Sequence, residues 1–382
     1  MRVLFTARAG LGHIHPLLPL ARALREAGHE VAMVSVEAMR ADVERERIPF
    51  FPAGINALGD PATMAAVNAV PLERQRAFIF GRVFAGIEVE ARLPELQSIV
   101  AEWNPDLLVH EQSEMTGAIV AAKAGIPHVT VSFGVMTPAE AIEIAEVSVE
   151  PHWRKVGLAP EPRCGLYTHL YLDTCPPTLQ TKAISEVRTR RALRPVPYGG
   201  DSGESPGALR DLKAPVVYVT LGTVFGRDAG LFKTIVEGVE SEAGSVVVTV
   251  GGRIDPTDLG PQPPHVHVHT FIPQARVLAL ADVMVTHGGS GSMLGGLGAG
   301  LPLLMVPQGA DQFLNSDRVA AAGAGLRILS SELSVGSVRS AIRRLLQDPS
   351  HREAARRIQV EIEAMPMPAE HVGTLEALAA QA

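Results

Sequence analysis

The sequence predicts an α/β protein of two domains, each built around a parallel β-sheet. Three observations favour this fold class. Short apolar runs alternate with longer amphipathic patterns, which is typical of parallel strands covered by helices. A stretch rich in Pro, Gly and Ser at 195–215 interrupts this alternation, and the alternation restarts after it. The length of 382 residues fits two medium-sized domains.

The first half of the chain supplies the N-terminal domain, which we expect at 1–197. Period-2 and continuous apolar patterns predict strands at 2–7, 30–36, 106–110 and 127–132. Helical periodicity predicts helices at 16–27, 38–47, 72–102 and 114–124. A basic cluster, RTRRALR at 188–194, has helical spacing and indicates a solvated helix face rather than a binding site for RNA or membrane.

The second half supplies a C-terminal domain at 215–365, after a linker at 198–214. Strands are expected at 215–221, 245–250, 265–270, 282–286 and 301–306, and helices at 228–240, 290–299, 312–323 and 334–347. A final segment, 366–382, contains one more helical pattern after the breaker MPMP.

Composition excludes several classes of protein. Hydrophobic residues make up 46% and charged residues 20%, as in globular proteins, and the net charge of −7 provides no general attraction to nucleic acid. The two cysteines, Cys164 and Cys175, match no zinc or redox motif, so we expect a cytoplasmic protein. No convincing signal peptide and no run near the roughly 20 apolar residues of a membrane span are found.

The first loop, RAGLGHIHP at 8–16, carries a candidate general base. Pro16 suits the first turn of a helix, so His13 is expected just before the positive helix end, which favours a neutral imidazole that can accept a proton. His15 is expected only to cap or pack. Glu111 ends a neighbouring strand and could orient the imidazole, with Glu114 and Asp106 as alternative acids.

Two other interpretations of this loop stay open. Gly10-x-Gly12-x-x-His15 nearly matches the dinucleotide fingerprint, and Glu37 ends the next strand, where an acid would bind a ribose. Histidine in place of the third glycine argues against that interpretation. A metal site would need further ligands beside the two histidines, and the sequence offers no obvious one.

The segment 287–319 predicts an anion site. His287-Gly288-Gly289-Ser290-Gly291-Ser292 follows an expected strand and opens a helix, so its backbone N–H groups suit a diphosphate. No Lys-Ser/Thr pair follows the glycines, so this is not a P-loop and no Mg²⁺ is implied. His287 could donate a hydrogen bond to the same diphosphate.

Polar side chains after two other strands extend this site. Thr223 follows the first strand of the domain and could bind the same anion through its hydroxyl and N–H. Gln308, Asp311 and Gln312 follow a later strand, where an acid and amides could recognise sugar hydroxyls. Asp311 could instead cap the helix that follows it.

Together these motifs resemble the family 1 glycosyltransferases of the GT-B fold, above all the bacterial enzymes that transfer deoxysugars to natural products. The matching pieces are Gly12-His13-x-x-Pro16, the run FIPQARVLALADVMVTHGGSGS at 271–292, and Pro307-Gln308-x-x-Asp311-Gln312 with Asn315. The resemblance is strongest at 265–325 and weak at 50–100 and 135–200.

The resemblance implies two Rossmann-like domains that face each other across a cleft, with the last helix packed back on the N-terminal domain. It implies that His13 is the base and that Glu111 orients it. The donor site it implies consists of Thr223, Phe271, Ile272, His287, Gly289, Gly291, Ser292, Gln308, Asp311 and Gln312. Phe271 stands where relatives usually have Trp, which favours dTDP-linked deoxysugars over UDP-glucose.

The expected reaction is an inverting transfer that needs neither metal nor a further cofactor. The donor is an NDP-sugar and the acceptor a small hydrophobic, polyketide-like aglycone, with no nucleic acid or membrane partner and with a homodimer left open. Apolar side chains expected to bind the acceptor are Phe51, Phe80, Phe84, Phe133 and Met136. The alternatives are an NAD-dependent oxidoreductase, a sugar-nucleotide epimerase and a catalytically silent partner of another transferase.

Overall fold

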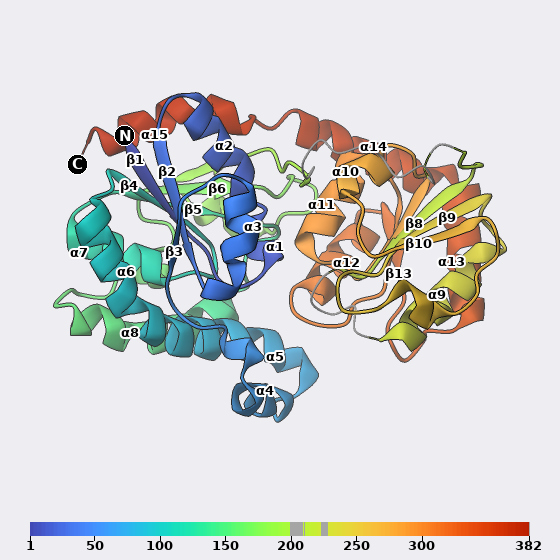
Figure 1. Cartoon of the computed structure of the whole chain (residues 1–382), viewed down its shortest axis with the longest axis horizontal. Helices are drawn as coiled ribbons and strands as arrows, with labels where there is room; N and C mark the ends of the chain where they lie inside the picture. The colour runs from blue at the N-terminus through green and yellow to red at the C-terminus, as the bar shows by residue number, and fades with distance from the viewer. Residues whose placement is uncertain (199–208, 210, 223–227, 382) are drawn as a thin grey trace. The chain divides into compact units, whose positions relative to one another are not determined.

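The computed structural model of the chain describes residues 1–198, 209, 211–222 and 228–381. Two compact units account for these residues (Figure 1). Unit 1 comprises Met1–Cys175, Thr181–Arg194 and Pro366–Ala382, and unit 2 comprises Pro176–Gln180 and Pro195–Met365. Most of the expected linker at 198–214 lies outside the described residues.

Unit 1 contains a parallel sheet of seven strands in the order β3-β2-β1-β4-β5-β6-β7. The strands are β1 (Arg2–Thr6), β2 (Glu30–Ser35), β3 (Phe50–Pro52), β4 (Leu107–Glu111), β5 (His128–Val131), β6 (Leu170–Asp173) and β7 (Arg190–Ala192). The strand order reverses at β1, whose neighbours are β2 and β4, and Thr6 pairs with His110. The loops after β1 and β4 therefore leave the sheet side by side, where ligands bind in open parallel sheets.

Unit 1 contains helices where the sequence predicted them and also at positions where it did not. They are α1 (Leu11–Ile14), α2 (Leu18–Glu26), α3 (Arg40–Arg45), α4 (Pro61–Asn68), α5 (Leu72–Phe78), α6 (Val89–Trp103), α7 (Thr116–Ala124), α8 (Ala139–Lys155) and α15 (Val372–Ala379), with short 3-10 turns η1 (Glu37–Met39), η2 (Ala57–Gly59), η4 (Pro162–Gly165), η5 (Lys182–Glu186) and η8 (Pro368–His371).

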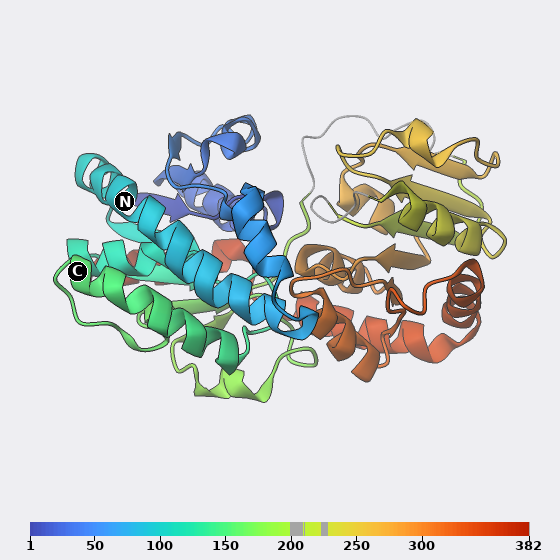
Figure 2. The same cartoon turned by 90° about the horizontal axis from the view of Figure 1, so that it is seen from below.

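The predicted helix at 72–102 is three helical segments in succession. Between α5 and α6 lies a π-helix, η3 (Ile79–Glu88). Figure 2 shows η3 and α6 alongside α8, and α8 packs on η3. Glycine makes this close packing possible, because a Cβ on Gly81 would lie 2.4 Å from the side chain of Ile144 in α8.

One local prediction is wrong. The basic cluster at 188–194 is not a helix face but contains β7, the edge strand of the sheet. Arg190 in β7 donates from Nε to Oδ2 of the buried Asp173 at the end of β6, at 2.7 Å. Short edge strands with charged side chains are common, because charge there discourages pairing with another chain.

Unit 2 contains a parallel sheet of six strands in the order β10-β9-β8-β11-β12-β13. The strands are β8 (Val216–Thr220), β9 (Ser245–Thr249), β10 (Val266–His269), β11 (Val283–Thr286), β12 (Leu303–Met305) and β13 (Gly325–Arg327). Its helices are α9 (Ala229–Glu240), the 3-10 turn η7 (Pro256–Leu259), α10 (Gln274–Leu278), α11 (Ser290–Gly298), α12 (Gln312–Ala321), α13 (Val335–Gln347) and α14 (Pro349–Glu363). Here too the strand order reverses at the first strand, so the loops after β8 and β11 are neighbours.

The end of the chain belongs to unit 1. Arg194 donates its backbone N–H to the carbonyl of Pro366 at 2.8 Å, and the Nε2 atom of His371 lies 2.9 Å from the carbonyl of Ala192. Farther along, Nε2 of His29 lies 2.9 Å from Oε1 of Glu376. The last segment of the chain, with η8 and α15, is therefore bound to the rest of unit 1 at Pro366, His371 and Glu376.

One short segment is assigned differently from our expectation. Residues Pro176–Gln180, within the expected N-terminal domain, belong to unit 2. The Thr178 backbone donates to Glu361 at 2.9 Å, and Arg318 donates from Nε to the carbonyl of Leu179 at 2.9 Å.

Among the helices that the structure describes, none is both long enough and apolar enough to pass through a membrane.

Candidate active site

His13 lies in the loop after β1, inside the single helical turn α1 rather than before the main helix. The expectation that His13 lies just before a helix starting near Pro16 is wrong, because His13 is part of α1 and α2 begins only at Leu18. Gly10 starts the turn with φ 118°, a conformation that side-chain-bearing residues rarely adopt. The turn directs the imidazole towards the loop after β4.

Both ring nitrogens of His13 have a polar neighbour. Nδ1 lies 3.2 Å from Oε1 of Glu111 and 3.4 Å from Oγ of Ser113. Nε2 lies 3.2 Å from Nη1 of Arg8. A carboxylate can only accept and a guanidinium can only donate, so the neutral ring carries its proton on Nδ1 and keeps its lone pair on Nε2. This is the form that can remove a proton from another molecule.

Glu111 ends β4 and is fully buried. Burial opposes its ionisation, but His13, Arg8 and the Ser113 N–H more than offset this and lower its pKa to about 2. The Ser113 N–H donates to Glu111 Oε2 at 2.6 Å, and the Ser113 hydroxyl donates at 2.9 and 2.8 Å to the two oxygens. Glu111 is therefore a fixed carboxylate facing the imidazole.

The two alternative acids have other partners. Glu114 accepts from the backbone of Thr116 and Gly117, both at 3.0 Å, and pairs with Arg92 at 3.2 Å. Asp106 precedes β4 and accepts from the backbone of Arg2 at 2.6 Å, at the other end of the strand. Glu111 is the acid that contacts His13.

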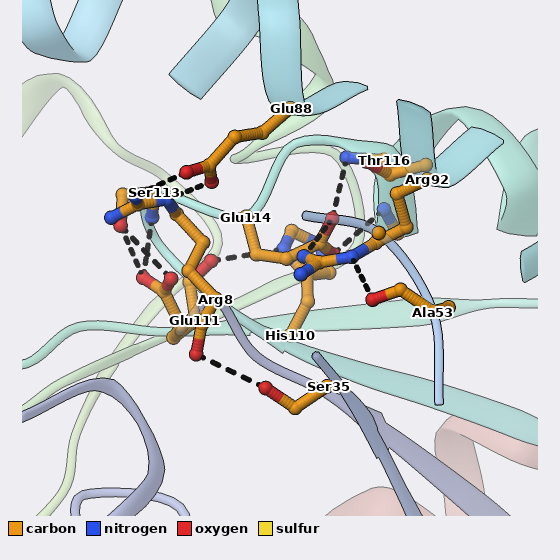
Figure 3. A network of polar contacts seen from close by, with 12 residues as sticks. Arg8, Ser35, Ala53, Glu88, Arg92, His110, Glu111, Ser113, Glu114 and Thr116 are labelled. Carbon is orange, nitrogen blue, oxygen red and sulfur yellow. Dashed lines mark hydrogen bonds and ion pairs between the residues drawn. The ribbon is translucent and has the colours of Figure 1, made fainter. Parts of the chain in front are cut away.

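An Arg–Glu pair on the other side of the imidazole was not predicted. Arg8 donates from Nε and Nη2 to the two oxygens of Glu88, at 2.5 and 2.8 Å, and both side chains are only 3% exposed. Figure 3 shows these two side chains pointing toward each other, beside Glu111 and Ser113. No motif marks Arg8 or Glu88, which meet only through folding, so sequence patterns offered no signal for the pair.

Of the five side chains expected to bind the acceptor, two flank His13. The ring of Phe133 lies edge-to-face at 5.2 Å between centroids, and that of Phe84 at 6.5 Å. Both are half-buried. The other three lie in apolar clusters: Phe51 against Trp103, Phe80 in the main core, and Met136 in a small cluster with Tyr171, Ile184 and Val187.

The other residues of the dinucleotide and metal interpretations, His15 and Glu37, do not contact the His13–Glu111 pair in the contacts that the structure gives. Burial lowers the pKa of His15 to about 4. Glu37, the candidate ribose acid, is paired with Arg40 at 2.7 and 2.9 Å. Across the described parts of the chain, no group of three or more His, Cys, Asp or Glu side chains could hold a metal ion.

In unit 2, His287 lies in the loop between β11 and α11. Its imidazole is close to the backbones of Gly222 and Gly289. A Cβ on Gly222 would lie 2.6 Å from the imidazole, and one on Gly289 would lie 2.5 Å from its Nε2. Burial lowers the pKa of His287 to about 4, so the ring is neutral near pH 7. The Thr286 hydroxyl accepts from the N–H of Gly288 and lies 3.3 Å from Nδ1 of His287. If that hydroxyl donates to Nδ1, Nε2 carries the ring proton and can donate it to a ligand.

Asp311 is tied to the start of α11. Its Oδ2 accepts from the Ser290 hydroxyl at 2.6 Å, the Ser290 N–H at 3.3 Å and the amide of Asn315 at 2.9 Å. The same buried amide donates to the carbonyl of Gly288 at 2.9 Å. Asp311 makes no side-chain cap to its own helix α12, and Ala310 before it has φ 53°. Asn315 belongs to the motif that begins at Pro307, but its position in the sequence did not predict this role.

The two glutamines mainly shape their own loop. Oε1 of the buried Gln312 accepts from the backbone N–H groups of Gln308 and Gly309, at 2.7 and 3.1 Å. Nε2 of Gln308 donates to the carbonyls of Val306 and Pro307, at 3.0 and 3.2 Å.

The other expected donor residues have varied surroundings. Phe271 is 59% exposed, whereas Ile272 is buried. Gly291 is exposed in the first turn of α11, and the hydroxyl of Ser292 is 3.4 Å from Nε2 of Gln274. Thr223 lies outside the described residues.

Comparison with known proteins decides the family. The models for the N-terminal and C-terminal domains of erythromycin biosynthesis protein CIII-like proteins match residues 22–222 and 234–378. The chain is 32% identical over 394 residues to the elloramycin glycosyltransferase ElmGT of Streptomyces olivaceus, covering 97% of this chain and 95% of that protein. The chain belongs to the bacterial natural-product glycosyltransferases of family 1.

Two further relatives agree with this assignment. The L-demethylnoviosyl transferase of Streptomyces niveus is 31% identical over 385 residues, covering 97% of this chain and 96% of that protein. The solved structure of the glycosyltransferase SsfS6 from Streptomyces sp. SF2575, complexed with thymidine diphosphate, is 27% identical, has a TM-score of 0.81 and covers 99% of each chain.

Family membership decides between the alternatives for activity. The chain is a glycosyltransferase with the two parallel-sheet domains of the GT-B fold, and not an oxidoreductase that binds a dinucleotide in its first loop.

Proposed function

We propose that this glycosyltransferase inverts the anomeric centre of an NDP-sugar, with His13 as the base. Nε2 of His13 takes the proton of the acceptor hydroxyl while the hydroxyl oxygen forms a bond to the anomeric carbon. The bond from that carbon to the diphosphate oxygen breaks, and the electron pair leaves with the nucleoside diphosphate. Attack from the side opposite the leaving group inverts the configuration.

The observation that carries this proposal is the geometry at His13. Glu111 lies 3.2 Å from Nδ1, and a donor-only group lies beside Nε2, so the lone pair of the neutral ring is on Nε2. Positioned bases of this kind contribute about 10²- to 10⁴-fold to the rate. The carboxylate also stabilises the imidazolium that forms during transfer.

We further propose that unit 2 holds the donor without a metal. The N-terminal turn of α11 and the N–H of His287 would neutralise charge on the leaving diphosphate. The network around Asp311 would hold this carboxylate for hydroxyls of the sugar. Thymidine diphosphate in the SsfS6 structure and Phe271 in this chain both favour a dTDP-linked donor.

The acceptor is proposed to be an apolar, polyketide-like aglycone. Phe84 and Phe133 flank the imidazole and would bind an apolar ring next to the reacting hydroxyl. One relative is an elloramycin glycosyltransferase, and the matching family models are those of erythromycin biosynthesis protein CIII-like proteins, which favours the same class of acceptor.

The test starts with thermal-shift screening of dTDP- and UDP-sugars, with and without EDTA. Hits are then incubated with apolar aglycones, and products are identified by mass spectrometry and NMR. We expect transfer with inversion that EDTA does not reduce, and a His13→Ala variant that binds donor but does not transfer. Transfer by that variant at the wild-type rate would refute the assignment of the base, and donor turnover without any acceptor would indicate an epimerase.

A further inference from the structure

The guanidinium of Arg8 is held at the nitrogen of His13 that must be free of a proton. Nη1 lies 3.2 Å from Nε2, while Nε and Nη2 are bound by Glu88. A guanidinium stays protonated and has no acceptor, so its contact with Nε2 requires a lone pair there.

The position of Arg8 is determined from three sides. Glu88 binds it with both oxygens, and the guanidinium carbon lies 3.0 Å from the centroid of the Phe84 ring. The Arg8 carbonyl accepts from the Ser35 hydroxyl at 3.2 Å, which fixes the backbone as well. Nη1, the remaining nitrogen, is the one directed at the imidazole.

The π-helix η3 supplies two of these contacts. Phe84 and Glu88 are four residues apart, close to one turn of a π-helix, so both side chains face the same guanidinium. Glu88 also accepts from the N–H of Ala57 at 3.2 Å, which ties it to η2.

The charged groups that face His13 come from three elements. Glu111, at the end of β4, stabilises the protonated ring, whereas Arg8, in the loop after β1, disfavours it. Glu88, in η3, acts through Arg8 and partly neutralises it. Removal of Arg8 would leave the charge of Glu111 unopposed at the imidazole.

We propose that Arg8, anchored by Glu88, is a positioning residue that locks His13 in the Nδ1–H tautomer and keeps Nε2 unprotonated for the acceptor hydroxyl. The role deepens the proposed function, since it assumes that His13 is the base. The acceptor hydroxyl and Nη1 of Arg8 bind the same lone pair, on Nε2 of His13. The acceptor therefore displaces Nη1 from Nε2 when it binds.

The decisive variant removes the pair together: Arg8→Met with Glu88→Gln. Removing Arg8 alone would leave a buried carboxylate without its partner, whereas replacing both members of a buried pair is usually tolerated. Arg8→Lys keeps a charged donor and serves as the rescue. The matched control is Arg92→Met with Glu114→Gln, because this pair is also buried, at 1% exposure each against 3% for Arg8 and Glu88, and lies in the same unit.

The first readout is the pH profile of kcat/KM for transfer. We expect the acidic limb of the double variant at Arg8 and Glu88 to move to higher pH by about one unit, since a donor that favours the neutral ring is lost. Arg8→Lys and the control at Arg92 and Glu114 should keep the wild-type limb. An unmoved limb in the first double variant, or an equal shift in the control, overturns the proposal.

The second readout does not depend on transfer. Long-range ¹H–¹⁵N NMR of protein labelled with ¹⁵N-histidine reports the tautomer, and His13→Gln identifies the His13 signals. We expect Nδ1 protonated and Nε2 unprotonated in the wild type, and a mixture or a protonated ring at the same pH in the double variant. A wild-type Nε2–H tautomer overturns the role of Arg8. Wild-type transfer by His13→Ala with the expected tautomer would instead refute only the proposed base.

Discussion

Oε1 of Glu111 lies 3.2 Å from Nδ1 of His13; Glu111 ends β4, and His13 lies in the loop after the neighbouring strand β1. The carboxylate is fully buried and the imidazole is partly exposed, so the pair has one fixed partner and one accessible partner. This arrangement is suited to a base that must reach a substrate while a buried carboxylate fixes its orientation.

Glu111→Gln should reduce transfer without loss of donor binding. The amide retains the shape of the carboxylate but removes the charge that stabilises the imidazolium. If its NH₂ group faces Nδ1, it cannot accept the hydrogen bond from Nδ1–H. We expect kcat to fall at least about 100-fold, with the dissociation constant for thymidine diphosphate unchanged. Steady-state kinetics and calorimetry measure these two quantities. The control is Asp106→Asn, at the other end of β4, and a comparable loss of kcat there would contradict the assignment.

Acidification below neutral pH should destabilise unit 1 through its buried histidines. Nε2 of His110 lies 3.0 Å from Nδ1 of His128, and burial holds the pKa of both below the ordinary value of 6.5. The unfolded chain therefore binds more protons than the folded chain once the pH falls below 6.5, and the free energy of unfolding decreases from there.

Urea unfolding at pH 7.5, 6.5 and 5.5 tests this expectation. The slope should approach about 1.4 kcal/mol per pH unit for each histidine involved, and His128→Gln should have a shallower slope than the wild type. Equal slopes in the two proteins would show that the histidine pair does not control acid stability.

Protonation of Glu111 should cause a second loss of stability at lower pH. Its pKa is about 2 in the folded protein against 4.5 without the fold, so its stabilising contribution is complete above pH 4.5 and is lost as the pH falls towards 2. Thermal unfolding of wild type and Glu111→Gln between pH 5 and pH 3 should converge as the pH is lowered. Parallel curves would mean that Glu111 is not ionised in the native state.

Gly291→Ala should weaken donor binding without affecting the fold. No atom lies within 4 Å of a Cβ at this position, so the free protein can accept alanine. If the diphosphate approaches the backbone at the start of α11, the methyl group would meet it, and we expect affinity for thymidine diphosphate to fall about tenfold. The melting temperature without ligand should not change. Gly252→Ala is equally free of neighbours and should alter neither quantity.

Asn315→Ala should destabilise unit 2 and impair donor binding together. Its buried amide donates to the carbonyl of Gly288, to Oγ of Ser290 and to Oδ2 of Asp311. Loss of these bonds should lower the free energy of unfolding by about 2–4 kcal/mol. Ser316→Ala, on the same helix, removes one hydrogen bond, to the carbonyl of Phe313 at 2.9 Å, and should cost about 1 kcal/mol with donor affinity intact. A similar loss of affinity in both variants would argue against a specific role for Asn315.

The sequence by itself determined the two parallel-sheet units, their longer strands and the loops that carry His13 and His287. These features follow from periodicity and from glycines next to strand ends, and both depend only on neighbours along the chain. Four strands of three or four residues, β3, β6, β7 and β13, were missed because each is too short for a period to be recognised. The long helix prediction at 72–102 could not distinguish an α-helix from the π-helix within it.

Only the tertiary structure decided which polar groups meet. Glu111 rather than Glu114 or Asp106 contacts the imidazole, Arg8 pairs with Glu88, and Asn315 links two loops. These contacts join residues that are distant in sequence, and each depends on strand order and on the packing of a helix against the sheet. Hydrogen bonds need partners within about 3 Å, and no local pattern specifies a distance across the fold.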